Sequence, residues 1–246
     1  MIRKEWTEQR LKLIVGLALG LVTLVIGIFL APGLGERSSD PGLKASVAQA
    51  TGQYPAYVWD TLFNPANSMG LALLILAATL GTSLIAGEVA RSTVFVLLSR
   101  PLSRDRILLI KYAVGAAGLL AVILILTGAL LIMTTAAGHP QHPGGALLSA
   151  LLLWLGSLFV LGLATAFSVV FGNVLVPLAL SLAVTGLLAF LPALLGLPAG
   201  WSLPNAWGSF PAFLGRQWPL RELLVSAVAA AMPLVLALLL FRRRQY

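Results

Sequence analysis

The sequence of 246 residues contains no cysteine and few charged residues, which make up 10% of the chain. The missing cysteine excludes disulfides, thiol catalysis and thiolate metal sites, and says little about the compartment. With 59% hydrophobic residues and a mean hydropathy of +0.97, the chain is too apolar for a soluble domain of this length. The composition therefore predicts a polytopic membrane protein.

Charge is missing altogether from the long stretch between Lys111 and Arg216, which has no Asp, Glu, Lys or Arg. Ion-coupled carriers need ionisable groups at membrane depth, where such groups are costly and kept for function. No GxxxxGK[ST] phosphate loop occurs anywhere in the sequence. Any nucleotide-driven transport must therefore draw its energy from another chain.

Groups for hydrolysis or metal binding are also scarce. The only histidines, His139 and His142, share one short loop between apolar runs, away from the serines at membrane depth. Two histidines without carboxylate or thiolate help make a poor metal site. We therefore expect no catalytic residue, no bound cofactor and no metal in this chain.

Six apolar runs are long enough to cross a bilayer as helices, which takes about 20 residues each. These runs are residues 13–31, 67–87, 107–136, 146–171, 174–197 and 221–241. The predicted fold class is all-α, with one transmembrane domain over residues 1–246.

The basic residues flank these runs unevenly. With six spans, both termini lie on one side, and only Arg37, Lys44, Arg216 and Arg221 of the 16 Lys and Arg residues fall on the other side. The positive-inside rule then predicts a multi-pass protein of the cell (inner, cytoplasmic) membrane with both termini in the cytoplasm. Because the basic residues border spans and form no separate domain, we expect no nucleic-acid partner.

Local signals mark the starts of several helices. Residues 1–12 are predicted to form an interfacial helix on the inner leaflet, the alternative being a basic flank that only orients the first span. Asn64 before Pro65 predicts the start of the second span, and Ser103 predicts the N-cap of a third helix of about 33 residues, roughly 50 Å long. The first turns of that helix should protrude into the cytoplasm.

The two segments predicted to lie outside the membrane differ in composition. Residues 32–66 are predicted to form a loop with no core of its own. The stretch after Leu197 is rich in proline and glycine and carries Trp201, Trp207, Phe210, Phe213 and Trp218. Because aromatics favour the headgroup layer, it predicts a hairpin of short re-entrant or interfacial helices, the alternative being an anchoring loop.

The segment at residues 88–106 places several charges and a proline between two apolar runs. In hydrocarbon, its arginines would cost about 2.5–3.5 kcal/mol each, so the segment must leave the membrane. Ala90, Val94, Leu97 and Leu98 recur at helical spacing, which predicts a short amphipathic helix that Pro101 ends.

This segment resembles the cytoplasmic segment of permease subunits in the type-2 ABC exporter family. The matching residues are Gly87, Glu88, Thr93, Leu97, Leu98, Ser99, Arg100, Pro101, Ser103, Arg104, Ile107 and Lys111. Where the family has a glycine before the threonine, this chain has Ser92. The subgroup that looks most similar includes permeases of nitrous-oxide reductase maturation, and drug and peptide exporters fit as well.

The resemblance implies a coupling helix between spans two and three, seated in a groove of a separate ATPase subunit. It also implies two ATPase copies that bind ATP and Mg, and a second permease copy, identical or not. The implied coupling residues are Glu88, Arg91, Thr93, Val94, Leu97, Leu98, Ser99, Arg100, Pro101, Ser103, Arg104 and Arg106. Within this set, Glu88 and Arg91 would pair at i, i+3, the apolar residues would fill the groove, and the later arginines would meet acidic partner surface or lipid headgroups.

The predicted function is that of a permease subunit in an ATP-driven exporter, which is not itself an enzyme. The candidate translocation path comprises Thr79, Thr82, Ser83, Thr127 and Ser168, and favours an amphipathic cargo over a small ion. Two alternatives remain: an ATP-independent membrane carrier, and a membrane scaffold or immunity-type binding protein. The GxxxG glycines Gly16 and Gly20 favour packing within the chain over a dimer face.

Overall fold

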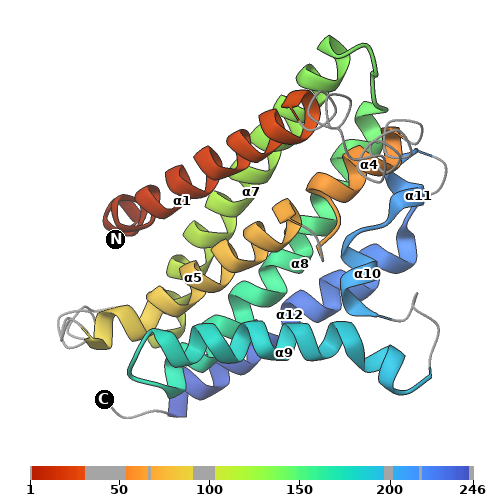
Figure 1. The fold of residues 1–246 in the computed structure, drawn as a ribbon. Helices are drawn as coiled ribbons and strands as arrows, with labels where there is room; N and C mark the ends of the chain where they lie inside the picture. The colour runs from red at the N-terminus through yellow and green to blue at the C-terminus, as the bar shows by residue number, and fades with distance from the viewer. Residues whose placement is uncertain are drawn as a thin grey trace, which may run out of the picture.

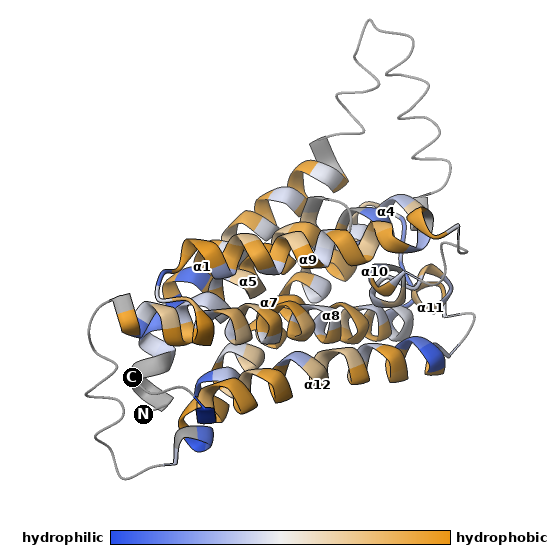
Figure 2. Cartoon of the chain, turned by 90° about the horizontal axis from the view of Figure 1, so that it is seen from below, coloured by the Kyte–Doolittle hydropathy of each residue, from blue (hydrophilic) through white to orange (hydrophobic). Residues whose placement is uncertain are grey.

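The structure, a computed structural model, describes residues 2–30, 54–65, 68–90, 103–196, 202–215 and 218–243. Every regular element in these ranges is a helix, and six of the helices are long and apolar enough to cross a membrane (Figure 1). Figure 2 shows that apolar residues cover the long helices along most of their length. The predicted all-α polytopic fold is confirmed.

The six long helices each overlap one of the apolar runs. They are α1 (Ile2–Val25, continued by the π-helix η1, Ile26–Leu30), α5 (Ser68–Ala90), α7 (Arg104–Ala136), α8 (Pro143–Val170), α9 (Leu175–Leu194) and α12 (Leu220–Arg243). Shorter helices are α4 (Tyr54–Leu62), α10 (Leu203–Trp207) and α11 (Phe210–Phe213).

Helix α8 lies at the centre of the bundle and contacts α5, α7, α9 and α12. Its approach to α5 depends on Gly81, because a Cβ there would lie only 2.5 Å from the carbonyl oxygen of Leu161. On another face of α8, a Cβ at Gly162 would lie 3.1 Å from Pro233 of α12. Small residues therefore set the spacing of the central helices, as is common between membrane helices.

Helix α1 packs along α5 and α7. A Cβ at Gly16 would lie 2.6 Å from Leu76, and one at Gly20 would lie 2.7 Å from Leu126. Both glycines thus serve contacts within the chain, in agreement with the sequence prediction. Residues 2–12 are helical and run into the first span without interruption, and their location on the inner leaflet stays a prediction.

The predicted Ser103 cap of the third helix is confirmed, whereas the cap predicted for the second span at Asn64 and Pro65 is not the start of α5. Helix α7 has 33 residues, and the Ser103 side chain accepts a hydrogen bond from the Arg106 N–H at 3.4 Å. Asn64, by contrast, donates from its amide to Asp60 at 2.6 Å, and α5 begins only at Ser68. The local cap signal at Asn64 therefore belongs to the turn that follows α4.

Residues 54–63 also differ from the predicted loop, because α4 contributes to the core. Val58, Leu62 and Phe63 are buried, and α4 contacts α5 and α11. The sequence prediction missed this helix because a short helix between polar segments carries only a weak periodic signal.

Two short helices, α10 and α11, lie in the stretch predicted to form a hairpin, and its main aromatic side chains lie inside the protein. Trp207 is fully buried against Gly156, at the middle of the 28-residue α8, and its ring centroid is 5.5 Å from that of Phe159. The two predicted arrangements of the hairpin, re-entrant and interfacial, stay predictions. Trp218 is 75% exposed, and Trp201 lies outside the described residues.

We call the residues that make these ring contacts the aromatic cluster: Trp59, Phe63, Phe159, Trp207, Phe210 and Phe213. Phe63 and Phe213 have ring centroids 5.4 Å apart, and Trp59 and Phe210 have centroids 5.3 Å apart. Trp207 and Phe213 are thus buried in contacts with Gly156 and Phe63, and the expected headgroup depth of this stretch stays a prediction.

Candidate functional site at the charged end

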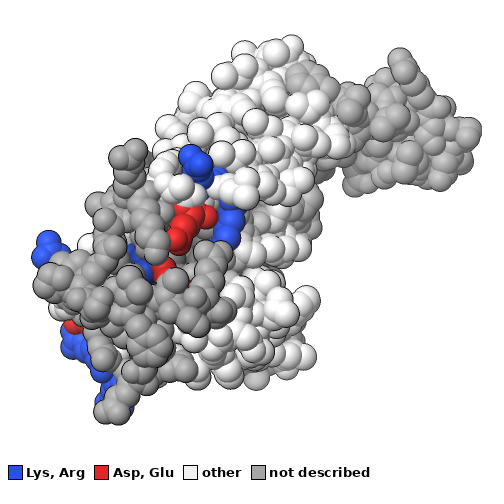
Figure 3. Space-filling model, turned by 90° about the vertical axis from the view of Figure 1, so that its left-hand side faces the viewer, with Lys and Arg blue, Asp and Glu red and all other residues white. Residues whose placement is uncertain are grey.

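The starts of α1 and α7 and the ends of α5 and α12 meet at one end of the molecule, which we call the charged end (Figure 1). Figure 3 shows Lys, Arg, Asp and Glu side chains gathered on this face. The predicted coupling segment 88–106 begins in the last turn of α5 and finishes in the first turn of α7.

Most of the predicted coupling residues lie outside the described residues. These are Arg91, Thr93, Val94, Leu97, Leu98, Ser99, Arg100 and Pro101. The amphipathic helix, its end at Pro101 and the Glu88–Arg91 pair therefore stay predictions. The structure describes the two helix ends on either side of this segment.

Glu88 and Lys111 join these two helix ends in a buried ion pair. Lys111 Nζ donates to Glu88 Oε1 at 3.0 Å, and the two side chains are only 1% (Lys111) and 6% (Glu88) exposed. A buried charge is costly unless it is paired, so loss of either partner would leave the other as an unpaired buried charge and would strongly destabilise the fold. The pair therefore couples the position of the α5 end to that of the α7 start.

Sequence reasoning placed Lys111 in the family pattern but gave it no role in the site. A signal was present, since Lys111 lies beyond the first turn of an apolar helix and precedes a long uncharged stretch. A lone cation in such a position needs an anionic partner. Glu88 is the acidic residue on the preceding span, and the two lie 23 residues apart.

Asp105 and Arg242 form a second ion pair, between the first turn of α7 and the last turn of α12. Arg242 Nε donates to both carboxylate oxygens at 3.0 and 2.9 Å, and its Nη2 donates to Oδ2 at 2.6 Å. The side chains of Arg242 and Asp105 are 62% and 30% exposed, so the pair contributes little stability. Its two-pronged geometry connects the end of the last helix to the start of α7.

The described remainder of the predicted coupling set lies on the first turn of α7. Ser103 caps the helix, Arg104 is its first residue, and Arg106 is exposed. An exposed guanidinium on this turn is able to face a partner surface or a headgroup, which is the role the resemblance implies for Arg106. That role stays a prediction.

The candidate path residues fall into two groups. Thr79 lines a groove between α1 and α5, and Ser83 lines a polar cavity closer to the charged end. Thr82, Thr127 and Ser168 are buried and donate to carbonyl oxygens of their own helices, at 3.1, 2.8 and 2.7 Å. Of the five candidate path residues, Thr79 and Ser83 are thus the two that line one of these cavities.

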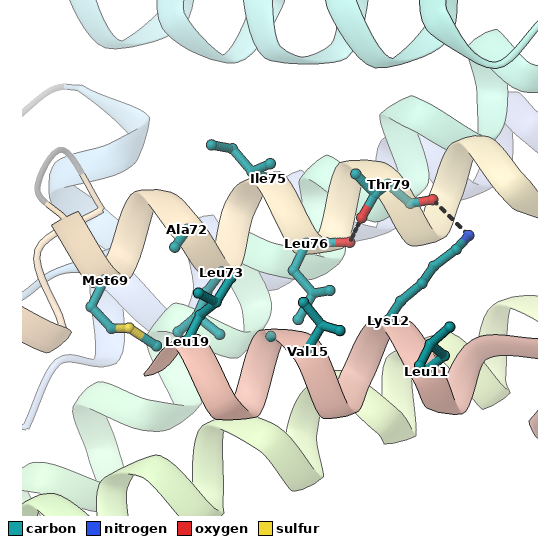
Figure 4. A pocket seen from close by; sticks show the side chains of 11 residues that line it. Leu11, Lys12, Val15, Leu19, Met69, Ala72, Leu73, Ile75, Leu76 and Thr79 are labelled. Carbon is teal, nitrogen blue, oxygen red and sulfur yellow. Dashed lines mark hydrogen bonds between the residues drawn. The ribbon is translucent and has the colours of Figure 1, made fainter. Parts of the chain in front are cut away.

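Helix α5 has an apolar groove on each side. The groove toward α1 has a volume of about 600 Å³ and runs from Lys12 at one end to Met69 at the other (Figure 4). The groove toward α9 has a volume of about 280 Å³, and among its described lining residues Thr185 is the polar one. Both are lined almost wholly by apolar side chains.

The histidine loop has a structural part in the described residues. His142 Nδ1 accepts a hydrogen bond from the Gly145 N–H at 3.0 Å and so caps α8. Across the described ranges, no group of three or more His, Asp or Glu side chains lies close enough to hold a metal ion.

Six apolar helices and a charged segment between the second and third of them define a multi-pass α-helical membrane protein. A model of the family described as ABC-2 family transporter protein matches residues 1–205, which include five of the six long helices. The chain belongs to this family, and so is a membrane permease subunit of an ABC transporter. None of the curated proteins compared with the chain matches it.

Proposed function

We propose that the chain is the permease subunit of an ATP-driven exporter, powered by a separate ATPase that docks on the predicted coupling segment, residues 88–106. The observation that carries this proposal is the buried Glu88–Lys111 pair, which links the helix ends on either side of the docking segment. The ATPase would supply the phosphate loop that this sequence lacks, and would bind ATP and Mg.

Movement of the docking segment would be transmitted directly to the helices of the bundle. Because Glu88 and Lys111 are paired, α5 and α7 respond together. Helix α5 in turn contacts α8 closely at Gly81, so its displacement shifts the central helix and alters both grooves beside α5. Closure of two ATPase copies would in this way change access to a path formed with a second permease copy.

The cargo that fits this chain is amphipathic. The grooves beside α5 are apolar, and the spans after Lys111 carry no charge with which to bind a small ion before Arg216. Export as the direction follows from the family resemblance. The distribution of basic residues favours the inner membrane with both termini in the cytoplasm.

The experiment that tests this proposal is recovery of the tagged protein from its native host in detergent, followed by ATP hydrolysis measurements. We expect an ATPase to co-purify, and we expect Leu97→Asp and Arg100→Glu to abolish its recovery while the permease still inserts. Glu88→Gln and Lys111→Met should retain the ATPase but uncouple ATP hydrolysis from transport, because they break the ion pair that connects α5 to α7.

The exposed residue Arg243 offers a matched control, since Arg243→Ala removes a cation from the same face without touching the pair. Recovery of the intact protein without an ATPase in every condition would contradict the proposal and favour the carrier or the scaffold. Flux that depends on an ion gradient and not on ATP would single out the carrier.

A further inference from the structure

A polar cavity and the apolar groove between α1 and α5 meet at Lys12. The polar cavity has a volume of about 140 Å³ and is lined by Glu8, Gln9 and Lys12 of α1 and by the last two turns of α5. The groove begins at Lys12 and follows both helices away from the charged end (Figure 4). Lys12 lines both, so the two spaces adjoin at its side chain, and we call them the polar part and the apolar part.

Gln9 is one of the residues that line the polar part. The residue is only 3% exposed, and neither Oε1 nor Nε2 has a hydrogen-bond partner among the described residues. Buried polar groups in folded proteins are nearly always hydrogen-bonded. A bound polar group that both donates and accepts would therefore match Gln9.

The charges of the polar part balance one another. Glu8 and Glu88 are acidic and Lys12 is basic. Lys111 is not among the lining residues but forms an ion pair with Glu88. Lys12 Nζ lies 3.5 Å from the Thr79 carbonyl oxygen, at the boundary with the groove. A neutral site that presents both signs complements a zwitterion, with its phosphate toward Lys12 and its amine toward Glu8.

The apolar part has the dimensions of one lipid chain in one leaflet. Along α1 it extends from Leu11 to Leu19, which is about 12 Å at 1.5 Å per residue. Half of a bilayer's hydrocarbon core is about 15 Å thick. A lysine at the polar end of such a groove is also typical of the membrane interface, where its ammonium reaches toward the headgroups.

We propose that this site binds one zwitterionic aminophospholipid, of the phosphatidylethanolamine type, from the leaflet at the charged end. The headgroup lies against Gln9 and Lys12, and one acyl chain lies in the groove beside Gly16 and Leu76. The site is formed within one copy of the chain, so this proposal does not depend on the ATPase partner or on export.

The test is native mass spectrometry of the full chain extracted from vesicles that contain equal amounts of phosphatidylethanolamine and phosphatidylglycerol with identical acyl chains. We expect one retained phosphatidylethanolamine per chain, in preference to phosphatidylglycerol. Gln9→Leu should lower that retention about tenfold, because it removes a hydrogen-bonding group inside a buried site. Its melting temperature should stay equal or rise, because the variant no longer buries an unpaired amide.

Filling the groove tests the apolar part separately. Ala72 lines the groove, so Ala72→Phe should displace the acyl chain and lower retention of both lipids. Ala179 is exposed on α9 and lines neither the polar cavity nor either groove, so Ala179→Phe is the matched control and should leave retention unchanged.

Two results would overturn the proposal. Equal retention of the two lipids, unchanged in Gln9→Leu, would mean that only unspecific surrounding lipid is present. Val15 is 49% exposed beside the groove and the chain has no cysteine, so Val15→Cys reports on a second copy without background. Efficient disulfide cross-linking of two copies through that position would mean that a second copy, and not a lipid, covers the groove.

Discussion

The charged end and the aromatic cluster hold the same bundle together by different means. At the charged end, two ion pairs join α5 to α7 and α7 to α12. In the aromatic cluster, large buried rings fill spaces beside glycines, as Trp207 does at Gly156. Buried aromatic surface contributes several times the energy of an exposed ion pair and leaves little room for rearrangement.

This contrast indicates where the bundle is able to move. Ion pairs act through a few atoms, and a partner that brings its own charges can compete with them. Close packing of rings changes only at the cost of a cavity. We therefore expect motion to start at the charged end and to fade toward the aromatic cluster.

Removing the central ring should have the largest effect on stability. Trp207→Ala would leave a cavity against Gly156 and Phe159, so we expect a loss of about 3–5 kcal/mol in the free energy of unfolding. Thermal unfolding in detergent measures this loss. Trp218→Ala is the control, since Trp218 is 75% exposed, and equal losses in both variants would contradict the packing described here.

Breaking the buried ion pair should have the second-largest effect on stability. Lys111→Met leaves Glu88 buried without its cation, and we expect a loss of about 3 kcal/mol, at the lower end of the range because the pair lies near the end of the bundle. Combining Lys111→Met with Glu88→Gln should recover most of that stability. Thermal unfolding of the two single variants and the double variant measures the coupling, and additive losses would mean that the two side chains do not depend on each other.

The sequence predicted what local signals encode. The length of α7 and its Ser103 cap follow from a serine, a charged turn and one long apolar run, all adjacent in the chain. The Glu88–Lys111 pair depends instead on how two helices dock, which no local pattern specifies. The Asp105–Arg242 pair joins residues 137 positions apart, and no local pattern predicted it either.

The aromatic hairpin illustrates the same limit. Tryptophan and phenylalanine near a span favour the membrane interface as a general rule. The slot that takes Trp207 exists because a distant residue, Gly156, has no side chain. Composition therefore predicted short helices in the hairpin but not the direction in which their rings point.

A smaller effect should come from the contact between the two central helices. Gly81→Ala would push a methyl group against the Leu161 carbonyl oxygen, and we expect a loss of about 1–3 kcal/mol. At Gly128 in α7, an added Cβ would meet nothing within 4 Å, so Gly128→Ala should instead stabilise the helix by about 0.5–1 kcal/mol. Chemical or thermal unfolding of both variants should give opposite signs, and a shared sign would contradict the close approach at Gly81.

The exposed ion pair should contribute least. Arg242→Ala should cost about 0.2–1 kcal/mol at low salt, and the difference from the unchanged protein should shrink as salt is added. Unfolding measurements across a salt series test this, with Arg243→Ala as the neighbouring control. A large loss that salt does not alter would mean that Arg242 acts through packing instead of charge.

Motion in the two regions can be compared by pulsed electron paramagnetic resonance on the permease reconstituted with its ATPase. Because the chain has no cysteine, spin labels go only where cysteine is introduced. One pair, Leu109→Cys with Gly172→Cys, reports on the charged end and avoids the predicted coupling residues, and the other, Pro140→Cys with Pro211→Cys, reports on the exposed surface near the aromatic cluster. We expect ATP to shift the first distance and to leave the second unchanged; a shift confined to the second pair would contradict the proposal that motion starts at the charged end.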